Sequence, residues 1–274
     1  MDFINSAIVW DPSISPFSIF GFGVRYYALC WVIGLIGAYY IVKRLYKNGG
    51  KSEEQFDPLF MYCFIGILVG ARLGHCLFYQ PDYYLSHPIE MLLPIKQTAD
   101  GWVFSGYEGL ASHGGTIGVI LALLLYVRKT GLKMVWTLDN LAIAAPFFAT
   151  MVRIGNFMNS EILGTETDLP WGVVFVQAGK TVPHHPAQLY EAMAYLVIFL
   201  IGILLYKKYK ERIGTGLFTG YCLFTIFTFR FFVEFIKEKQ VNFEESMTLD
   251  MGQWLSIPLI ILGGYYLFRN IRRS

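Results

Sequence analysis

Charged residues are scarce in this sequence of 274 residues, of which only 15% are Asp, Glu, Lys or Arg. Soluble domains carry about 25% charged residues. Hydrophobic residues make up 55% of the chain and aromatic residues 17%. This composition excludes an ordinary water-soluble fold and predicts an all-α protein that crosses a membrane several times.

Cysteine is also rare, and no two cysteines form a CxxC pair. The cysteines are Cys30, Cys63, Cys76 and Cys222, all in apolar segments. We predict buried free thiols, without a disulfide framework. The His184-His185 pair is followed by Pro186, which is typical of the start of a helix. We therefore expect no metal and no cofactor.

The first 25 residues lack a basic start, a continuous apolar run and a small-residue cleavage site. They do not resemble a cleavable signal peptide.

The chain also lacks a phosphate-binding nucleotide motif, so a phosphate-binding site in it would serve a lipid. We see no inverted repeat of the kind found in transporters.

Seven apolar stretches are long enough to be membrane helices, since about 20 residues cross the hydrocarbon layer. They are Tyr26–Val42, Pro58–Tyr79, Leu110–Val127, Leu138–Phe157, Gln188–Tyr206, Gly216–Ile236 and Gly252–Phe268. Fourteen of the 22 lysines and arginines follow the first, third, fifth and seventh stretches, and five lie on the opposite side. The positive-inside rule then places the N-terminus outside and the C-terminus in the cytoplasm. We predict one integral membrane domain over residues 1–274, with small irregular segments at the outer face.

Polar residues gather at the end of the fourth apolar stretch and just after it: Arg153, Asn156, Asn159 and Glu161, closing at Gly164. A charge buried in a membrane is costly unless it is paired. Arg153 and Asn156 lie on one face if the helix persists. We predict that this segment binds an anionic lipid headgroup. The alternative is a structural network in which Glu161 neutralises Arg153.

The sixth stretch contains Arg230 and Glu234, four residues apart. The fork of donors on arginine matches phosphate oxygens, so Arg153 and Arg230 together suit one phosphodiester. The alternative is a structural ion pair between Arg230 and Glu234. Gln188 and Glu191 enter the fifth stretch, where they must find polar partners.

His113 stands beside Gly114 and Gly115 at the start of the third stretch, which leaves room around its imidazole. It is a candidate base, or else a packed membrane histidine. Arg72 lies within a double small-xxx-small pattern of glycines. It either extends to the interface or faces a ligand. Tyr27, at the outer boundary, either belongs to an aromatic belt or contacts the headgroup.

Several short stretches occur in one order along nearly the whole chain. They are Tyr27-Ala28-Leu29, Gly70 with Arg72 and Gly74, Ser112 to Gly118, Arg153 to Gly164, His185 to Glu191, Arg230 with Glu234, and Met251-Gly252-Gln253 with Ser256-Ile257-Pro258. Together they resemble the motifs of bacterial prolipoprotein diacylglyceryl transferases. The match from Arg153 to Gly164 is the most specific. One departure is Ile226, where many relatives have a tyrosine; Thr225 and Thr228 carry the nearby hydroxyl groups.

The resemblance implies an enzyme that moves the diacylglyceryl group of phosphatidylglycerol to the lipobox cysteine thiol in the signal peptide of a prolipoprotein. A thioether forms and glycerol 1-phosphate leaves, in the first step of bacterial lipoprotein maturation. It also implies the bacterial inner membrane, an active site toward its outer face and no nucleic-acid partner. The implied catalytic residues are His113, Arg153 and Arg230. The implied substrate-binding residues are Tyr27, Arg72, Gly114, Gly115, Asn156, Asn159, Glu161, Gly164 and Glu234.

Two other functional classes use the same arginines. One is a non-catalytic protein that binds or translocates lipid, which needs no base. The other is a phospholipase or headgroup transferase, in which water or an alcohol replaces the thiol.

Overall fold

The computed structural model describes residues 8–13, 15–19, 22–93, 95–98, 101–104, 109–239 and 247–272. The chain divides into two compact units. Unit 1 comprises Met1–Leu45 and Leu138–Ser274, and unit 2 comprises Tyr46–Thr137.

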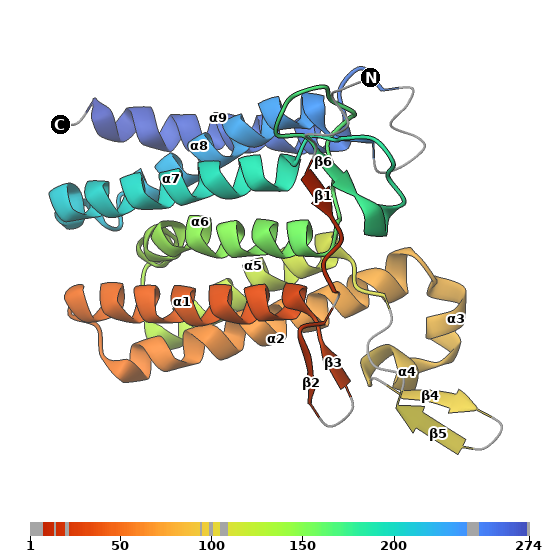
Figure 1. Ribbon diagram of the computed structural model, residues 1–274. Helices are drawn as coiled ribbons and strands as arrows, with labels where there is room; N and C mark the ends of the chain where they lie inside the picture. Colours follow the sequence, from red (N-terminus) through yellow and green to blue (C-terminus); the bar gives the residue numbers. More distant parts are fainter. Residues whose placement is uncertain are drawn as a thin grey trace. The chain divides into compact units, whose positions relative to one another are not determined.

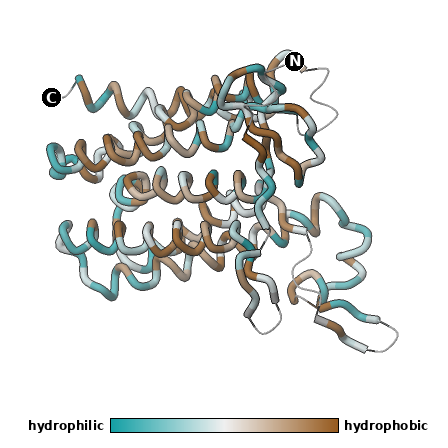
Figure 2. Tube along the Cα trace, viewed as in Figure 1, coloured by the Kyte–Doolittle hydropathy of each residue, from teal (hydrophilic) through white to brown (hydrophobic). Residues whose placement is uncertain are grey.

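Long apolar helices dominate the structure, which confirms a mostly helical membrane protein (Figures 1 and 2). In the described ranges, six helices are long and apolar enough to cross a membrane. They are α1 (Tyr26–Asn48), α2 (Glu53–Phe78), α6 (Met134–Met158), α7 (Ala187–Tyr209) continued by η3 (Lys210–Arg212), α8 (Leu217–Val233) continued by η4 (Glu234–Ile236), and α9 (Met251–Ile271). Helix α5 (Ser112–Thr130), the predicted third span, is not among them because polar residues occupy both its ends. By length and composition, six of the seven predicted spans are thus candidate membrane helices.

In unit 1, helices α7, α8 and α9 lie side by side (Figure 1). Helices α8 and α9 approach closely through glycines: a Cβ added at Gly220 would lie 2.6 Å from the backbone nitrogen of Leu267. The fully buried Asp139 of α6 accepts hydrogen bonds from the backbone N–H groups of Gly214, Gly216 and Thr219. This carboxylate holds the start of α8, where helical N–H groups lack partners of their own.

The N-terminal segment covers the end of α6. Strand β1 (Ile8–Trp10) pairs in parallel with β6 (Val173–Phe175), which precedes the turn η2 (Val176–Ala178). The indole N–H of Trp10 donates to the carbonyl oxygen of Phe157 at 3.2 Å. A short hairpin of β2 (Phe17–Ile19) and β3 (Phe22–Val24) leads into α1. Figure 1 shows β1 beside β6 near the start of α7.

Unit 2 is built on a close crossing of α2 and α5. Gly66, Gly70 and Gly74 of α2 face Gly114 and Gly118 of α5, and a Cβ at these positions would overlap backbone atoms of the partner helix. The small-xxx-small pattern predicted from the sequence is therefore confirmed. Beyond α2, the chain forms a small arm of α3 (Pro81–Ser86), α4 (Pro88–Leu92) and the hairpin of β4 (Ile95–Thr98) and β5 (Gly101–Phe104).

Candidate functional site

Arg153 lies near the end of α6 with only 11% of its side chain exposed. Its Nε atom is 3.1 Å from Glu191 Oε2, and its Nη1 atom donates to Asn156 Oδ1 at 3.2 Å. The prediction that Arg153 and Asn156 share a helix face is confirmed. Nη2 has no hydrogen-bond partner in the described part of the chain. One edge of the guanidinium is therefore open to a ligand.

Glu161 is joined to Arg153 through an amide and not by a direct ion pair. Asn156 Nδ2 donates to Glu161 Oε2, and Asn159 Nδ2 donates to Glu161 Oε1, both at 3.1 Å. The two asparagines thus hold the carboxylate from both sides. The alternative in which Glu161 neutralises Arg153 is wrong, because Glu191 takes that position.

The turn after α6 has an unusual backbone. Ser160 and Ile162 have φ angles of 53° and 58°, which L-residues rarely adopt and β-branched residues least of all. Such residues cost about 1–3 kcal/mol each and persist where surrounding contacts hold them. Here the N–H of Gly164 donates to the carbonyl of His185, and that of Glu238 to the carbonyl of Leu163. This turn directs Glu161 back toward Asn156.

Gly164 lies where three backbone segments meet. It forms a bridge with Lys237, and a Cβ here would lie 2.5 Å from His185 Cβ and 2.8 Å from the carbonyl oxygen of Ile236. Real Cβ atoms do not approach other atoms this closely, so only glycine fits without a shift. Close packing accounts for this glycine, and its part in substrate binding stays a prediction.

Glu191 of α7 is fully buried and links two cations. Its Oε2 atom is 3.1 Å from both Arg153 Nε and Lys237 Nζ. Lys237 Nζ is also 3.2 Å from Glu234 Oε2. Glu234 therefore pairs with Lys237, and the alternative ion pair between Arg230 and Glu234 is wrong. The sequence indicated that Glu191 needs partners, but it did not identify Lys237 as one of them.

The guanidinium of Arg230 on α8 makes no hydrogen bond or ion pair with any residue that the structure describes. It is half-buried, and it lies close enough to Tyr195 of α7 to interact with it electrostatically, as does Arg153. A guanidinium in an apolar helix is stabilised by an anion. The open donors of Arg153 and Arg230 therefore suit one anionic group.

Tyr27 lies against α6 in unit 1. A Cβ at Gly155 would be 3.0 Å from Tyr27 Cδ2, so the ring packs beside the residue that precedes Asn156. The two hydroxyl groups near Ile226 differ. That of Thr225 donates to the carbonyl of Tyr221 at 2.7 Å, whereas the buried hydroxyl of Thr228 has no hydrogen-bond partner in the described part of the chain. Thr228 lines an apolar cavity of about 360 Å³ between α8 and α9.

Unit 2 contains the remaining predicted site residues. His113 lies exposed in the first turn of α5 and has no hydrogen-bond partner in the described ranges. Gly114 and Gly115 are buried. The Arg72 guanidinium donates to the carbonyls of Glu90 (2.6 Å) and Met91 (3.2 Å). Arg72 therefore holds the end of α4, which favours a structural role; a role in binding stays a prediction.

The histidines before α7 are engaged with protein groups. His184 Nδ1 is 2.8 Å from the carbonyl oxygen of Val182, and His185 Nδ1 is 3.2 Å from the hydroxyl of Tyr190. Burial lowers the pKa of His185. Within the residues that the structure describes, no group of three His, Cys, Asp or Glu residues could hold a metal ion.

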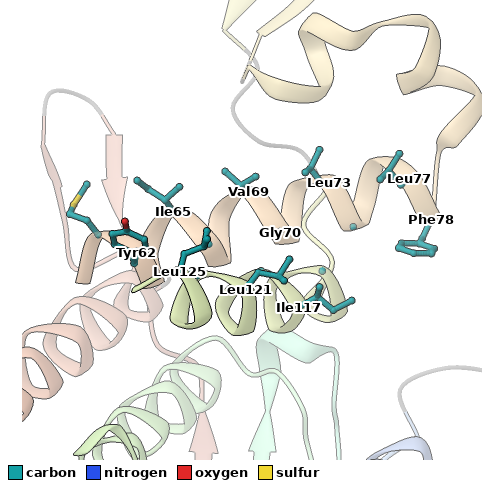
Figure 3. A pocket seen from close by; sticks show the side chains of 16 residues that line it. Tyr62, Ile65, Val69, Gly70, Leu73, Leu77, Phe78, Ile117, Leu121 and Leu125 are labelled. Carbon is teal, nitrogen blue, oxygen red and sulfur yellow. The ribbon is translucent and has the colours of Figure 1, made fainter. Parts of the chain in front are cut away.

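An apolar groove runs along the crossing of α2 and α5 (Figure 3). It has a volume of about 530 Å³, and glycines form its floor while aliphatic side chains such as Ile65, Val69, Ile117 and Leu121 form its walls. Such a lining matches hydrocarbon and offers no group for chemistry.

These features define a class: a multi-pass membrane protein with arginines near the ends of two of its apolar helices. The particular family follows from comparison with known proteins. The family described as prolipoprotein diacylglyceryl transferase matches residues 15–269. The chain belongs to this family, as its motifs indicated.

Relatives in three bacteria carry the name phosphatidylglycerol–prolipoprotein diacylglyceryl transferase. The protein of Bacteroides fragilis is 54% identical over 263 residues, covering 96% of this chain and 95% of the relative. That of Porphyromonas gingivalis is 40% identical over 281 residues, covering 97% of this chain and 95% of the relative. That of Chloroherpeton thalassium is 36% identical over 271 residues, covering 98% of this chain and 97% of the relative.

Proposed function

We propose that this chain transfers the diacylglyceryl group of phosphatidylglycerol to the lipobox cysteine thiol of a prolipoprotein. The observation that carries the proposal is the pair of open guanidinium groups, Arg153 on α6 and Arg230 on α8, in otherwise apolar helices. Phosphatidylglycerol supplies one phosphodiester with a single negative charge at that depth. The names of the relatives and the family match support the same reaction.

The reaction breaks one carbon–oxygen bond and forms one carbon–sulfur bond. The cysteine sulfur, as thiolate, attacks the glyceryl carbon that is bonded to the phosphate oxygen. The bonding electrons leave with that oxygen, and glycerol 1-phosphate departs with a second negative charge. Arg153 and Arg230 stabilise this growing charge, which is where preorganised donors lower a barrier most.

A base must take the proton of the thiol, whose ordinary pKa is about 8.5. We assign this role to His113, because its imidazole is exposed and makes no other hydrogen bond in the described part of unit 2. Imidazole is suited to proton transfer near neutral pH. Replacement of His113 by Gln should reduce turnover strongly. Near-normal turnover of His113→Gln would remove the base assignment and leave the transferase assignment intact.

The remaining site residues position the lipid. We assign headgroup contacts to Asn156, Asn159 and Glu161, which form one hydrogen-bonded set beside Arg153. Tyr27, next to Gly155, borders that set. Glu234 holds Lys237 near Glu191 and so keeps the charges balanced. Further contacts to lipid or peptide are assigned to Arg72, Gly114, Gly115 and Gly164.

We further propose a single membrane domain over residues 1–274 with seven spans. Paired strands lie on one side of a membrane, so β1 and β6 require an even number of crossings between them. Helices α1, α2 and α6 supply three, and α5 supplies the fourth. Helices α7, α8 and α9 then place the C-terminus on the opposite side. The distribution of Lys and Arg favours a cytoplasmic C-terminus in the bacterial inner membrane, with the Arg153 site toward the outer face.

The product of the reaction tests the function. Purified protein in phosphatidylglycerol vesicles, with a lipobox cysteine peptide, should yield a thioether-linked diacylglyceryl peptide by mass spectrometry. A matched peptide with Ser in place of Cys is the control. Release of lipid phosphate without peptide would favour a hydrolase. Lipid binding with no covalent product in either reaction would favour a binding or translocating protein.

A further inference from the structure

A buried hydroxyl group beside the arginines has no part in the steps above. Tyr195 of α7 is 3% exposed, and its hydroxyl donates to Glu191 Oε1 at 2.9 Å. The two residues are four apart and lie on one helix face. The ring of Tyr195 packs edge-on against Phe229 of α8, with centroids 6.4 Å apart. The hydroxyl is thus held between α7 and α8, within electrostatic reach of Arg153 and Arg230.

Glu191 depends on this hydroxyl because the carboxylate is fully buried. A buried carboxylate needs donors at both of its oxygens. Oε2 lies 3.1 Å from Arg153 Nε and from Lys237 Nζ in ion pairs but accepts no hydrogen bond, so the hydroxyl of Tyr195, at Oε1, is the hydrogen-bond donor to this carboxylate in the described part of the chain. Without that donor the carboxylate would rotate to share its cations between both oxygens. The contact that fixes Arg153 Nε would then loosen.

We propose that Tyr195 is a positioning residue for Arg153 that acts through Glu191. It fixes the guanidinium so that the open Nη2 atom faces the lipid phosphate. This inference rests on the proposed function, because it assigns the phosphate as the ligand of Arg153. Preorganised charge favours the transition state over the bound substrate, so loss of the hydroxyl should lower kcat more than it raises KM.

The test compares two tyrosine-to-phenylalanine variants. Tyr195→Phe removes one hydroxyl and keeps the ring against Phe229. The matched control is Tyr221→Phe on α8, because the hydroxyl of Tyr221 also bridges α7 and α8, but donates to the carbonyl of Ile198 at 2.9 Å. Tyr195→Phe should lower kcat about ten- to hundredfold, the range for a hydrogen bond to a charged group. Tyr221→Phe should keep kcat within about twofold of the unchanged protein.

Four results of the product assay in phosphatidylglycerol vesicles are distinguishable. A fall in kcat for Tyr195→Phe alone, at nearly constant KM and unfolding midpoint, supports the proposal. Equal falls for both variants overturn it, because any hydroxyl between α7 and α8 would then matter. Unchanged kcat for Tyr195→Phe also overturns it. If the unchanged protein forms no thioether product, the proposed function itself fails.

A double-mutant cycle tests the route through Glu191. Glu191→Gln should lower kcat at least as much as Tyr195→Phe. Adding Tyr195→Phe to Glu191→Gln should then lower kcat by less than about threefold, because the hydroxyl no longer has a carboxylate to hold. If the two losses multiply in full, the hydroxyl acts independently of Glu191 and the proposal is overturned.

Discussion

Two kinds of arginine occur among the residues of the apolar helices. Arg72 donates to two backbone carbonyls of α4, which favours a structural role, and its role in binding stays a prediction. Arg153 is held at Nε and Nη1 but keeps one edge open, and Arg230 is unpaired in the described part of unit 1. On the proposed function, the free donors of Arg153 and Arg230 are the ones that would bind the phosphate.

Arg153→Lys tests the fork of donors. Lysine keeps the charge, but it cannot contact Glu191, Asn156 and a phosphate at once. We expect the kcat/KM for thioether formation to fall about a hundredfold or more, as it does when one transition-state donor is lost. Arg212→Lys is the control, because Arg212 lies beyond the far end of α7. Its guanidinium donates one hydrogen bond, to the carbonyl of Asn270 in α9. Retention of activity within a few-fold in Arg153→Lys would exclude bidentate contact with phosphate.

Among the elements, the crossing of α2 and α5 depends most on residue size. Lipid tails are as apolar as leucine, so membrane helices gain stability from close backbone approach. A Cβ at Gly118 would overlap the carbonyl oxygen of Gly66 and lie 2.9 Å from Gly70 Cα. The helices can relieve this overlap only by separating.

Gly118→Ala should therefore reduce the free energy of unfolding by about 1–3 kcal/mol, as overpacking does. Gly202→Ala on α7 is the matched control, because a Cβ there meets only Tyr221 Cε1 at an ordinary 3.5 Å. Unfolding of each variant in a denaturing detergent, monitored by circular dichroism, gives its unfolding midpoint. Equal midpoints for the two variants would mean that the α2–α5 contact is not tight.

The arm after α2 should respond to acid through Glu90. The hydroxyl of Tyr83 and the N–H of Gln97 donate to its carboxylate at 2.6 and 2.9 Å, and both lower the pKa of Glu90. Its contribution to stability is therefore complete above the unfolded pKa of about 4.3 and is lost as pH falls through the lower folded value.

Hydrogen exchange measures this effect. The protection factor of the Gln97 amide should fall between pH 6 and pH 3. In Glu90→Gln it should be lower at pH 6 and nearly constant over the same range, because the titrating group is gone. A protection factor that does not change with pH in the unchanged protein would contradict the assignment.

For the whole molecule, the strand pair of β1 and β6 argues for an even number of crossings before the loop that contains β6, which we propose to lie outside. Labelling of single cysteines tests the resulting topology. Asp168→Cys in that loop should react with a membrane-impermeant maleimide added to intact spheroplasts, and Glu211→Cys in η3 should react only after lysis. Both positions are exposed, so accessibility is not the difference between them. The reverse pattern would invert the orientation, and labelling of both in intact spheroplasts would exclude a membrane crossing by α7.

Properties that depend on local composition were readable from the sequence. Apolar length predicted the membrane helices, glycine spacing predicted the close crossing, and the cost of an unpaired charge identified Arg153 and Arg230. Helix periodicity predicted that Arg153 and Asn156 share a face, and the folded chain joins them by a hydrogen bond. These features need only neighbouring residues, so no knowledge of distant contacts was required.

Pairings between distant segments required the folded chain. The sequence showed that Glu191 needs polar partners, but one of its partners, Lys237, lies beyond α8. Glu234 pairs with Lys237, whereas the sequence suggested Arg230 as its partner. The contact between Tyr195 and Glu191 is local to α7, but the packing of Tyr195 against Phe229 of α8 and the ion pair of Glu191 with Arg153 of α6 depend on the folded chain. A helix repeats every few residues and can be read locally. Which buried donor meets which acceptor depends on how helices pack, and this leaves no local signal in the sequence.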